Sequence, residues 1–265
     1  PAPGRPPGRD RAAAPKPRGI PTLPRVNAFG QGWDLSGMTP WLAICAALTV
    51  LLGAYSLVHY VGALLFLLRR RGPAPTARST DAVSVLVPAR NEGACAVRAL
   101  RSLLAQDHDG PLTHYLLLKD RSDTSLPFLV DAFPDADLSA PGDLLPLQDG
   151  AVVVFTGHDP KHAKVNWMTA RLETPWLAIL DCDHQAEPAW IRTSLALLHQ
   201  HGARMVQGRR APLRAGGFFP LWDSLHQHVG CELFNASFDR LGLTVYFTGT
   251  TAVMETALLQ ERPLR

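Results

Sequence analysis

The sequence predicts an α/β domain with a mostly parallel sheet and flanking helices, preceded by one transmembrane helix. Two observations support this fold class. From residue 81 onward, short apolar segments rich in β-branched residues alternate with segments of helical periodicity, and an uncharged apolar segment precedes them. We therefore divide the chain into a disordered Pro- and Arg-rich tail (1–40), the transmembrane helix (41–68), a basic linker (69–80) and one α/β domain (81–265).

The charge of the chain is unevenly distributed. Ten of its 26 Lys and Arg residues lie before residue 81, together with only two of its 23 Asp and Glu residues. The remainder therefore holds 16 basic and 21 acidic side chains. A mildly acidic domain argues against a nucleic-acid partner, and the first 40 residues contain too few large apolar side chains to form a core.

The segment 41–68 contains no Asp, Glu, Lys or Arg. It is longer than the ~20 residues that a helix needs to cross a bilayer. Trp41 stands at one end and Arg69–Arg71 follow the other. The positive-inside rule places this basic end, and the domain after it, in the cytoplasm at an inner or plasma membrane. A fully buried helix of a soluble protein is the alternative.

The domain begins with a strand at 83–87, which is β-branched and stops at Pro88. The next segment, 94–106, has apolar residues on one helical face. The pattern then repeats, with strands predicted at 115–118, 152–155, 176–180 and 204–207 and helices at 161–172 and 188–199. Residues 133–150 are rich in Pro, Asp and Leu, and we expect a surface excursion there.

Polar residues follow four of these strands, at 88–92, 120–123, 161–166 and 181–183. In a parallel sheet such strand ends open onto one edge, so these residues are expected to share a crevice. Asp181 and Asp183 offer hard oxygen ligands that suit Mg²⁺ or Mn²⁺, and such ions commonly bridge to phosphate oxygens. The chain has neither the dinucleotide fingerprint nor the P-loop motif, which disfavours both of those sites.

The string VSVLVPARNE at 83–92 resembles the opening motif of the family-two glycosyltransferases, the group that includes cellulose, hyaluronan and chitin synthases. The resemblance continues in order through motifs at 119–122, 162–166, 180–184, 206–209 and 247–252. It implies the Rossmann-like GT-A fold. It also implies transfer of a sugar from a nucleotide donor, usually UDP-linked, with inversion at the anomeric carbon.

The resemblance also implies roles for single positions. The residues that would bind the nucleotide sugar are Pro88, Ala89, Arg90, Glu92, Asp120, Lys164, Asn166, Asp181 and Gln207. Asp183 would be the direct ligand of the divalent cation, Mg²⁺ or Mn²⁺, and Asp181 would face the ribose or the same ion. Arg90 and Glu92 have an alternative, which is to pair with each other at a helix start. His184 either packs under the site or contacts the donor.

An inverting transfer needs a carboxylate that takes the proton of the acceptor hydroxyl. In the family this Asp follows the segment that matches 247–252, and here the sequence stops at Arg265 without a matching motif. Glu255 lies near, at a position where relatives often have Arg. We therefore expect the base beyond Arg265, with the chain as the amino-terminal piece of a longer protein.

The predicted function is that of a membrane-anchored, metal-dependent hexosyltransferase that moves a sugar from a UDP-sugar to a polysaccharide or lipid acceptor. One alternative is a lipid glycosyltransferase of the ceramide glucosyltransferase type, which Lys164-Val165-Asn166 resembles. Another is a catalytically silent relative that binds nucleotide or scaffolds a membrane complex. The aromatic residues between 218 and 238 are typical of a core or of an amphipathic helix at a membrane surface.

Overall fold

The structure is a computed structural model that describes residues 40–68, 75, 77–148, 150–210, 217–228, 235, 238–239, 242 and 246–265. Residues 1–39 of the predicted tail and most of the predicted basic linker lie outside the described residues. The apolar helix and the α/β domain are each described by themselves.

Helix α1 (Pro40–Leu68) is 29 residues long and carries no charged side chain. Its segment Pro40–Val58 has a mean hydropathy of 2.1, and none of that segment is buried. By length and composition, α1 can cross a membrane.

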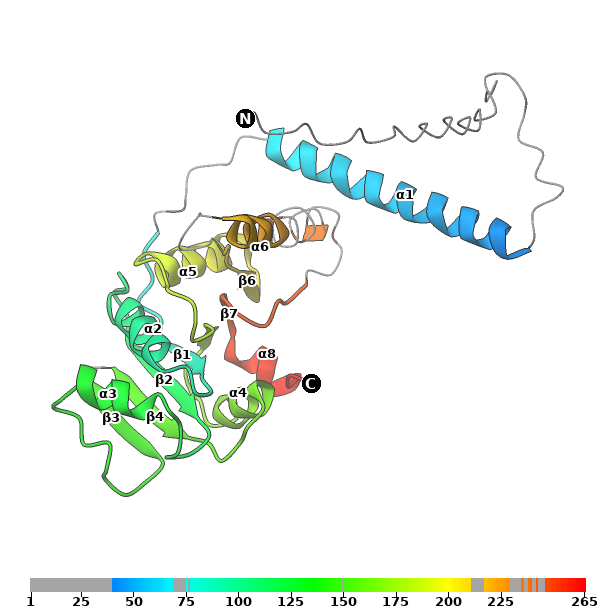
Figure 1. The fold of residues 1–265 in the computed structure, drawn as a ribbon. Coiled ribbons are helices and arrows are strands. Elements are labelled where there is room, and N and C mark those ends of the chain that lie inside the picture. Colours follow the sequence, from blue (N-terminus) through cyan, green and yellow to red (C-terminus); the bar gives the residue numbers. More distant parts are fainter. Residues whose placement is uncertain are drawn as a thin grey trace, which may run out of the picture. The chain divides into compact units, whose positions relative to one another are not determined.

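The α/β domain is built on a seven-stranded sheet of order β3-β4-β2-β1-β5-β7-β6 (Figure 1). The strands are β1 (Val83–Pro88), β2 (Leu112–Leu118), β3 (Leu144–Gln148), β4 (Ala151–Phe155), β5 (Trp176–Ile179), β6 (Met205–Gln207) and β7 (Ala252–Glu255). The four central strands β4, β2, β1 and β5 are parallel. β3 and β7 run antiparallel to their neighbours. The predicted fold class, a mostly parallel α/β sheet, is confirmed.

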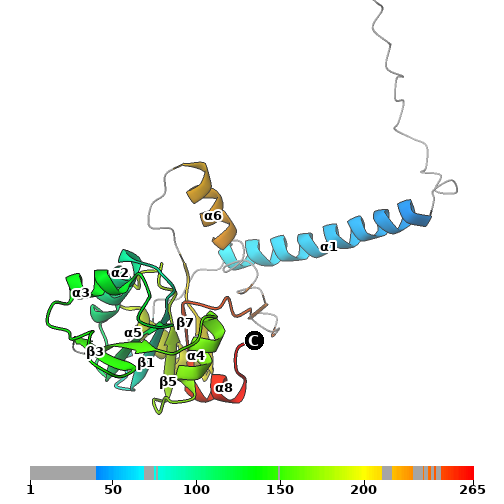
Figure 2. The same ribbon diagram turned by 60° about the horizontal axis from the view of Figure 1, so that its bottom comes forward.

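Helices cover both faces of this sheet (Figures 1 and 2). They are α2 (Ala94–Leu104), α3 (Leu126–Ala132), α4 (Lys161–Thr169), α5 (Trp190–His201) and α8 (Thr256–Glu261). Helix α6 (Phe218–His228) projects away from the sheet (Figure 2). Alternate residues of β1 serve opposite faces, as the pleat of a strand requires. Val85 and Val87 pack in the core shared with α2 and α5, whereas Leu86 packs in the core shared with α4 and α8.

The segment that leads into β1 is fastened to the amino-terminal edge of the sheet. The Arg78 guanidinium pairs with Asp107 at 3.3 Å and Asp109 at 2.6 Å. Gly110 lies so close to this segment that a Cβ there would sit 2.5 Å from the carbonyl oxygen of Thr80. Only glycine permits this approach, so the chain before β1 is held against the domain.

Asp81 makes a second attachment at the same edge. Its Oδ2 accepts a hydrogen bond from the Trp176 indole at 3.1 Å and lies 2.8 Å from Nε2 of His199. The two rings meet edge to face, with centroids 5.6 Å apart. Residues from β5 and α5 thereby hold the start of the domain.

Residues 133–150 differ from the sequence-based expectation. A surface excursion was predicted there, but Leu144–Gln148 forms the edge strand β3, paired antiparallel with β4. Its side chains alternate between exposed and buried, and its middle residue is Pro146. An edge strand tolerates proline because one row of its N–H groups needs no partner in the sheet.

Candidate active site

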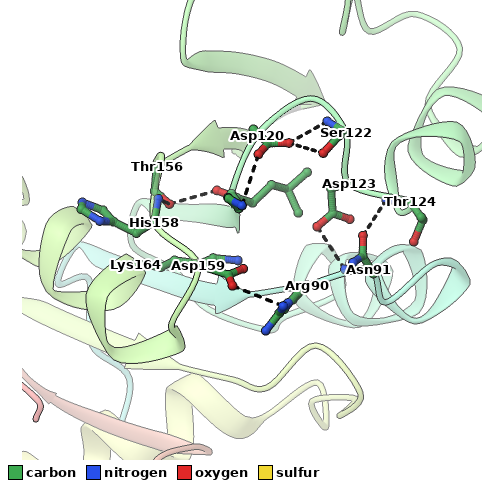
Figure 3. A network of polar contacts seen from close by, with 12 residues as sticks. Arg90, Asn91, Asp120, Ser122, Asp123, Thr124, Thr156, His158, Asp159 and Lys164 are labelled. Atoms are coloured by element: carbon green, nitrogen blue, oxygen red, sulfur yellow. Dashed lines mark hydrogen bonds and ion pairs between the residues drawn. The ribbon is translucent and has the colours of Figure 1, made fainter.

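The register of the sheet brings the predicted polar loops to one edge. The parallel strands β1, β2, β4 and β5 end there, and β7 runs the opposite way, so the loop before it reaches the same edge. The loops concerned are 89–93, 119–125, 156–160, 180–184 and 246–251. Figure 3 shows the polar contacts among the first three.

The loop after β1 is held by the loop after β2. Oδ2 of the buried Asp123 accepts the N–H of Asn91 at 3.0 Å, and Oδ1 of Asn91 accepts the N–H of Thr124 at 3.1 Å (Figure 3). Asn91 has φ 57°, a left-handed conformation that asparagine adopts more readily than most residues. The Ser125 hydroxyl accepts the N–H of Glu92 at 3.1 Å. These bonds orient the backbone at Glu92.

Lys164 lies beneath these loops and is only 1% exposed. Its Nζ donates a hydrogen bond to the carbonyl oxygen of Ala89 at 2.5 Å. Burial lowers the pKa of the Lys164 ammonium, while the negative charges of Asp123 and Asp159 act in the opposite direction. The structure thus places the Lys164 amino group directly under the end of β1.

Two exposed side chains border Lys164. Oδ1 of Asp120 accepts both the N–H and the hydroxyl of Ser122, and these bonds hold the pKa of the Asp120 carboxyl below its usual range. Arg90 pairs with Asp159 at 3.2 Å across the loops after β1 and β4 (Figure 3). Arg90 therefore does not take the predicted alternative of pairing with Glu92.

An acidic cluster follows β5. One ligand atom each of Asp181, Asp183 and His184 lies within 4.8 Å of the others. The Asp181 carboxylate pairs with the Lys161 ammonium, and its backbone N–H donates to the Thr250 hydroxyl at 2.8 Å. Asp183 is the most exposed of the three. The residues present fit a divalent cation, since two carboxylates suit Mg²⁺ and Mn²⁺ and an imidazole is a further ligand for transition metals.

The Glu92 carboxyl is influenced by charges from both parts of the crevice. Its pKa is raised, first by burial and then by the negative charges of Asp183, Asp123 and Asp181. The Glu92 carboxyl is close enough to the loop after β2 and to the acidic cluster for the charges of both to act on it. A cation bound by the cluster would offset this repulsion.

Gln207 supports the site through the main chain. Its Nε2 donates to the carbonyl oxygens of Thr250 at 2.6 Å and Thr251 at 3.2 Å, and its Oε1 accepts the N–H of Thr248 at 3.4 Å. Gly208 follows, where a Cβ would meet Thr251 atoms at 2.7 and 2.8 Å. Gln207, predicted to bind the nucleotide sugar, is placed so that it shapes the loop carrying Thr250 under Asp181.

Asn166 is engaged away from these loops. Its Nδ2 donates to the carbonyl oxygen of Leu264 at 2.8 Å and its Oδ1 accepts the N–H of the same residue at 2.9 Å. The structure does not bring Asn166 together with the acidic cluster, and its predicted contact with the donor stays a prediction.

The position of Glu255 contradicts its suggestion as general base. β7 runs antiparallel to β5, with Glu255 opposite Trp176 at the start of β5 and Ala252 opposite Ile179 at its end. Glu255 therefore lies at the sheet edge opposite the crevice. Its carboxylate pairs with Arg204 at 2.5 Å.

A cavity of about 790 Å³ adjoins the acidic cluster. Residues from the end of β5, from α5, from the segment after β6 and from α6 line it. They include Asp183, His184, Trp190, Gln207, Arg209 and Asp223. The crevice therefore has the loops after β1 and β2 on one side of the cluster and this cavity on the other.

Several residues of the site were not singled out from the sequence. They are Asn91, Asp123, Ser125, Lys161 and Thr250. Lys161 and Asn91 lie inside or beside the motifs quoted above, which is a signal that could have found them. Asp123 lies in the polar segment 120–123 that was expected at the crevice, but its bond to the N–H of Asn91 was not foreseen. Ser125 acts on a backbone N–H more than 30 positions away, and the sequence carries no comparable signal for it.

Comparison with known proteins agrees with this geometry. The model of the family described as "Glycosyl transferase family 2" matches residues 84–262. No curated protein sequence matches the chain. Among solved structures, the mannosyltransferase PcManGT from Pyrobaculum calidifontis, in complex with GDP-Man and Mn²⁺, aligns with a TM-score of 0.54 and 19% identity, over 83% of this chain and 57% of that one.

Two other structures align less closely. S. aureus TarS 1–349 has a TM-score of 0.45 and 15% identity, with 68% of this chain and 48% of that one covered. M. tuberculosis glucosyl-3-phosphoglycerate synthase has a TM-score of 0.42 and 18% identity, with 68% and 58% covered. The chain thus spans about half to three fifths of the length of these structures. Because the family match covers more than half of the chain, the protein belongs to glycosyl transferase family 2.

Proposed function

We propose that the protein is a membrane-anchored, metal-dependent hexosyltransferase that transfers a sugar from a UDP-sugar to a polysaccharide or lipid acceptor, with inversion. One observation carries the proposal. Loops from four parallel strands place Glu92, Asp120 and Lys164 at the same edge as the acidic cluster of Asp181, Asp183 and His184. The complex of PcManGT with GDP-Man and Mn²⁺ supports a nucleotide-sugar donor and a divalent cation.

On the nucleotide side, each residue has a task that follows from its contacts. The ionised Asp120 is an acceptor for N–H groups of the base, and its place in the motif is the reason to propose uridine. Lys164 holds the end of β1 through Ala89 and adds positive charge under the donor. Glu92, fixed by Ser125, faces the space between the base-side loops and the cluster.

On the phosphate side, Asp183, Asp181 and His184 would hold the cation. A bound Mg²⁺ or Mn²⁺ would neutralise the charge that develops on the diphosphate as the sugar–phosphate bond breaks. Lys161 pairs with the Asp181 carboxylate and holds it in place, and the Thr250 hydroxyl accepts the backbone N–H of Asp181. The acceptor would approach from the cavity beside the cluster.

Anchoring by α1 is part of the proposal. The helix is long and apolar enough for one span, and the arginines that follow it in the sequence favour a cytoplasmic domain under the positive-inside rule.

The test is titration calorimetry of UDP into the full chain with Mn²⁺ and with EDTA. Asp183→Asn should lose the Mn²⁺-dependent part of the affinity, by at least about tenfold, which corresponds to ~1.4 kcal/mol. Asp131→Asn, an exposed residue of α3, is the matched control and should bind as the wild type does. Equal affinities for wild type and Asp183→Asn in Mn²⁺ would refute the metal site.

Release of UDP from a UDP-sugar, measured on the same samples, tests the reaction itself. Turnover in the wild type and none in Asp183→Asn would support an enzyme. Tight UDP binding without any turnover by the full-length protein would favour the silent nucleotide-binding relative.

A further inference from the structure

Lys161 is the first residue of α4, and its ammonium pairs with the Asp181 carboxylate of the acidic cluster. The two side chains are 40% and 29% exposed, so a ligand in the crevice can reach both. A Cβ at Gly249, whose φ is 83°, would lie 3.8 Å from Nζ of Lys161. The ion pair therefore lies where α4, the loop after β5 and the loop before β7 meet.

The stability of α4 does not explain a lysine at this position. The first turn of α4 has no acidic residue and contains Lys161, His162 and Lys164. Positive charge at the amino-terminal end of a helix opposes the helix dipole, which favours carboxylates there. A residue that disfavours its own helix and contacts a functional cluster is better explained by the site than by the fold.

The lysine and a divalent cation would share the same carboxylate. Asp181, Asp183 and His184 each place one ligand atom within 4.8 Å of the others, and Lys161 already contacts one Asp181 oxygen. A cation held by this cluster would lie close to the Lys161 ammonium, and two positive charges at short range repel each other. The bare cation therefore binds at a disadvantage, which an anion that contacts both positive groups would remove.

We propose that Lys161 opposes the binding of a bare divalent cation at the acidic cluster and binds the diphosphate that arrives with the cation. The site then accepts the cation and the diphosphate as one complex. Lys164 does not compete for this role, because it is 1% exposed and its Nζ is bonded to the carbonyl oxygen of Ala89. The inference rests on the proposed function, to which the cation and the nucleotide donor belong.

The first measurement is the binding of Mn²⁺ alone to the full chain in detergent, read from the EPR signal of free Mn²⁺ without nucleotide. Lys161→Met removes the charge and retains the length of the side chain. It should bind Mn²⁺ at least about threefold more tightly than the wild type, since both the ion pair and the repulsion are lost. A lysine that merely holds Asp181 in place predicts the opposite change. Unchanged or weaker Mn²⁺ binding by Lys161→Met overturns the inference.

Lys119→Met is the matched control for charge. The Lys119 side chain is 50% exposed and its Nζ lies 3.9 Å from Asp120, so this variant also removes a lysine from beside an aspartate. It should bind Mn²⁺ alone as the wild type does, and an equal gain would assign the effect to overall charge and refute the inference. Adding Asp183→Asn to Lys161→Met should abolish the gain. A gain that survives this change would place the Mn²⁺ outside the cluster and would refute the inference too.

The second measurement, calorimetry of UDP at saturating Mn²⁺, should change in the opposite direction. Lys161→Met should bind UDP about tenfold more weakly, as expected for the loss of charge-assisted hydrogen bonds to phosphate. Lys161→Arg keeps the positive charge and should recover most of the affinity. Uridine, which has no phosphate, should bind the wild type and Lys161→Met equally. Equal UDP affinities for these two proteins would show that Lys161 does not bind the diphosphate.

The failure of this inference can be distinguished from the failure of the proposed function. Mn²⁺-dependent UDP binding by the wild type, together with weaker binding of Mn²⁺ alone by Lys161→Met, would refute the inference and leave the proposed function intact. Wild-type UDP binding that is the same in Mn²⁺ and in EDTA would refute the proposed metal site, and the role of Lys161 with it.

Discussion

His114 should make the stability of the domain depend strongly on pH. It lies on the central strand β2 and is 3% exposed, and its Nδ1 has no hydrogen-bond partner among the described residues. Burial lowers its pKa from 6.5 to about 4. The folded protein therefore keeps His114 neutral, whereas the unfolded chain binds a proton at that ring below pH 6.5.

The direction and size of the pH effect on stability follow from this difference in pKa between the folded and the unfolded state. Between pH 6.5 and about 4 the unfolded state binds more protons, so the free energy of unfolding falls as the pH falls. For this pair of pKa values, His114 alone lowers the free energy of unfolding by about 2 kcal/mol between pH 7 and pH 5, and by ~3 kcal/mol between pH 7 and pH 4. His114→Phe removes the titrating group while retaining a ring in the core, so its stability should fall less on acidification.

Urea unfolding of the full chain in detergent, followed by tryptophan fluorescence at pH 7, 6 and 5, measures this effect. The chain has ten histidines, so the comparison of interest is wild type against His114→Phe at each pH. The two curves of stability against pH should diverge by about 2 kcal/mol at pH 5. Parallel curves would show that His114 is not held neutral in the fold.

Three further predictions concern the loops and the opposite edge. Gly208→Ala should weaken UDP binding and lower the melting temperature, because its Cβ would clash with Thr251, whereas Gly53→Ala, with nothing within 4 Å, should do neither. Asn91→Val should destabilise the protein by ~1–3 kcal/mol more than Asn91→Gly in thermal unfolding, because both lose the hydrogen bond from the Thr124 N–H but only valine is strained at a positive φ. Glu255→Gln should leave sugar transfer by a catalytically active chain unchanged and alter stability by less than about 1 kcal/mol, since its ion pair is exposed; a large loss of turnover would restore it as a base.

The parallel core of the fold could be predicted because its strands are continuous apolar runs between helical segments. β1, β2, β4 and β5 are all of this kind. The two antiparallel strands were not predicted. β3 alternates between exposed and buried residues at the edge of the sheet, and the four-residue β7 takes its place between β5 and β6 only through long-range pairing.

The residues of the candidate site also divide into those that the sequence could locate and those that it could not. Charged residues directly after a strand, such as Asp120 and Asp183, could be located because strand direction alone brings them to the crevice. Amides were harder to place, since Asn166 and Gln207 have side chains that bind the main chain as readily as a ligand. Their partners, at Leu264 and Thr250, depend on how distant segments fold back onto them.

The attachments at Arg78 and Asp81 limit how far the crevice can reach from a membrane that holds α1. Nine residues separate Leu68 from Arg78, and this tether extends to at most about 35 Å. The edge that carries the crevice lies at the other end of β1, ~20 Å farther along the strand. With α1 in a bilayer, as proposed, an acceptor group standing more than roughly 55 Å from the leaflet is out of range. Lengthening the tether would widen that working distance without touching the chemistry.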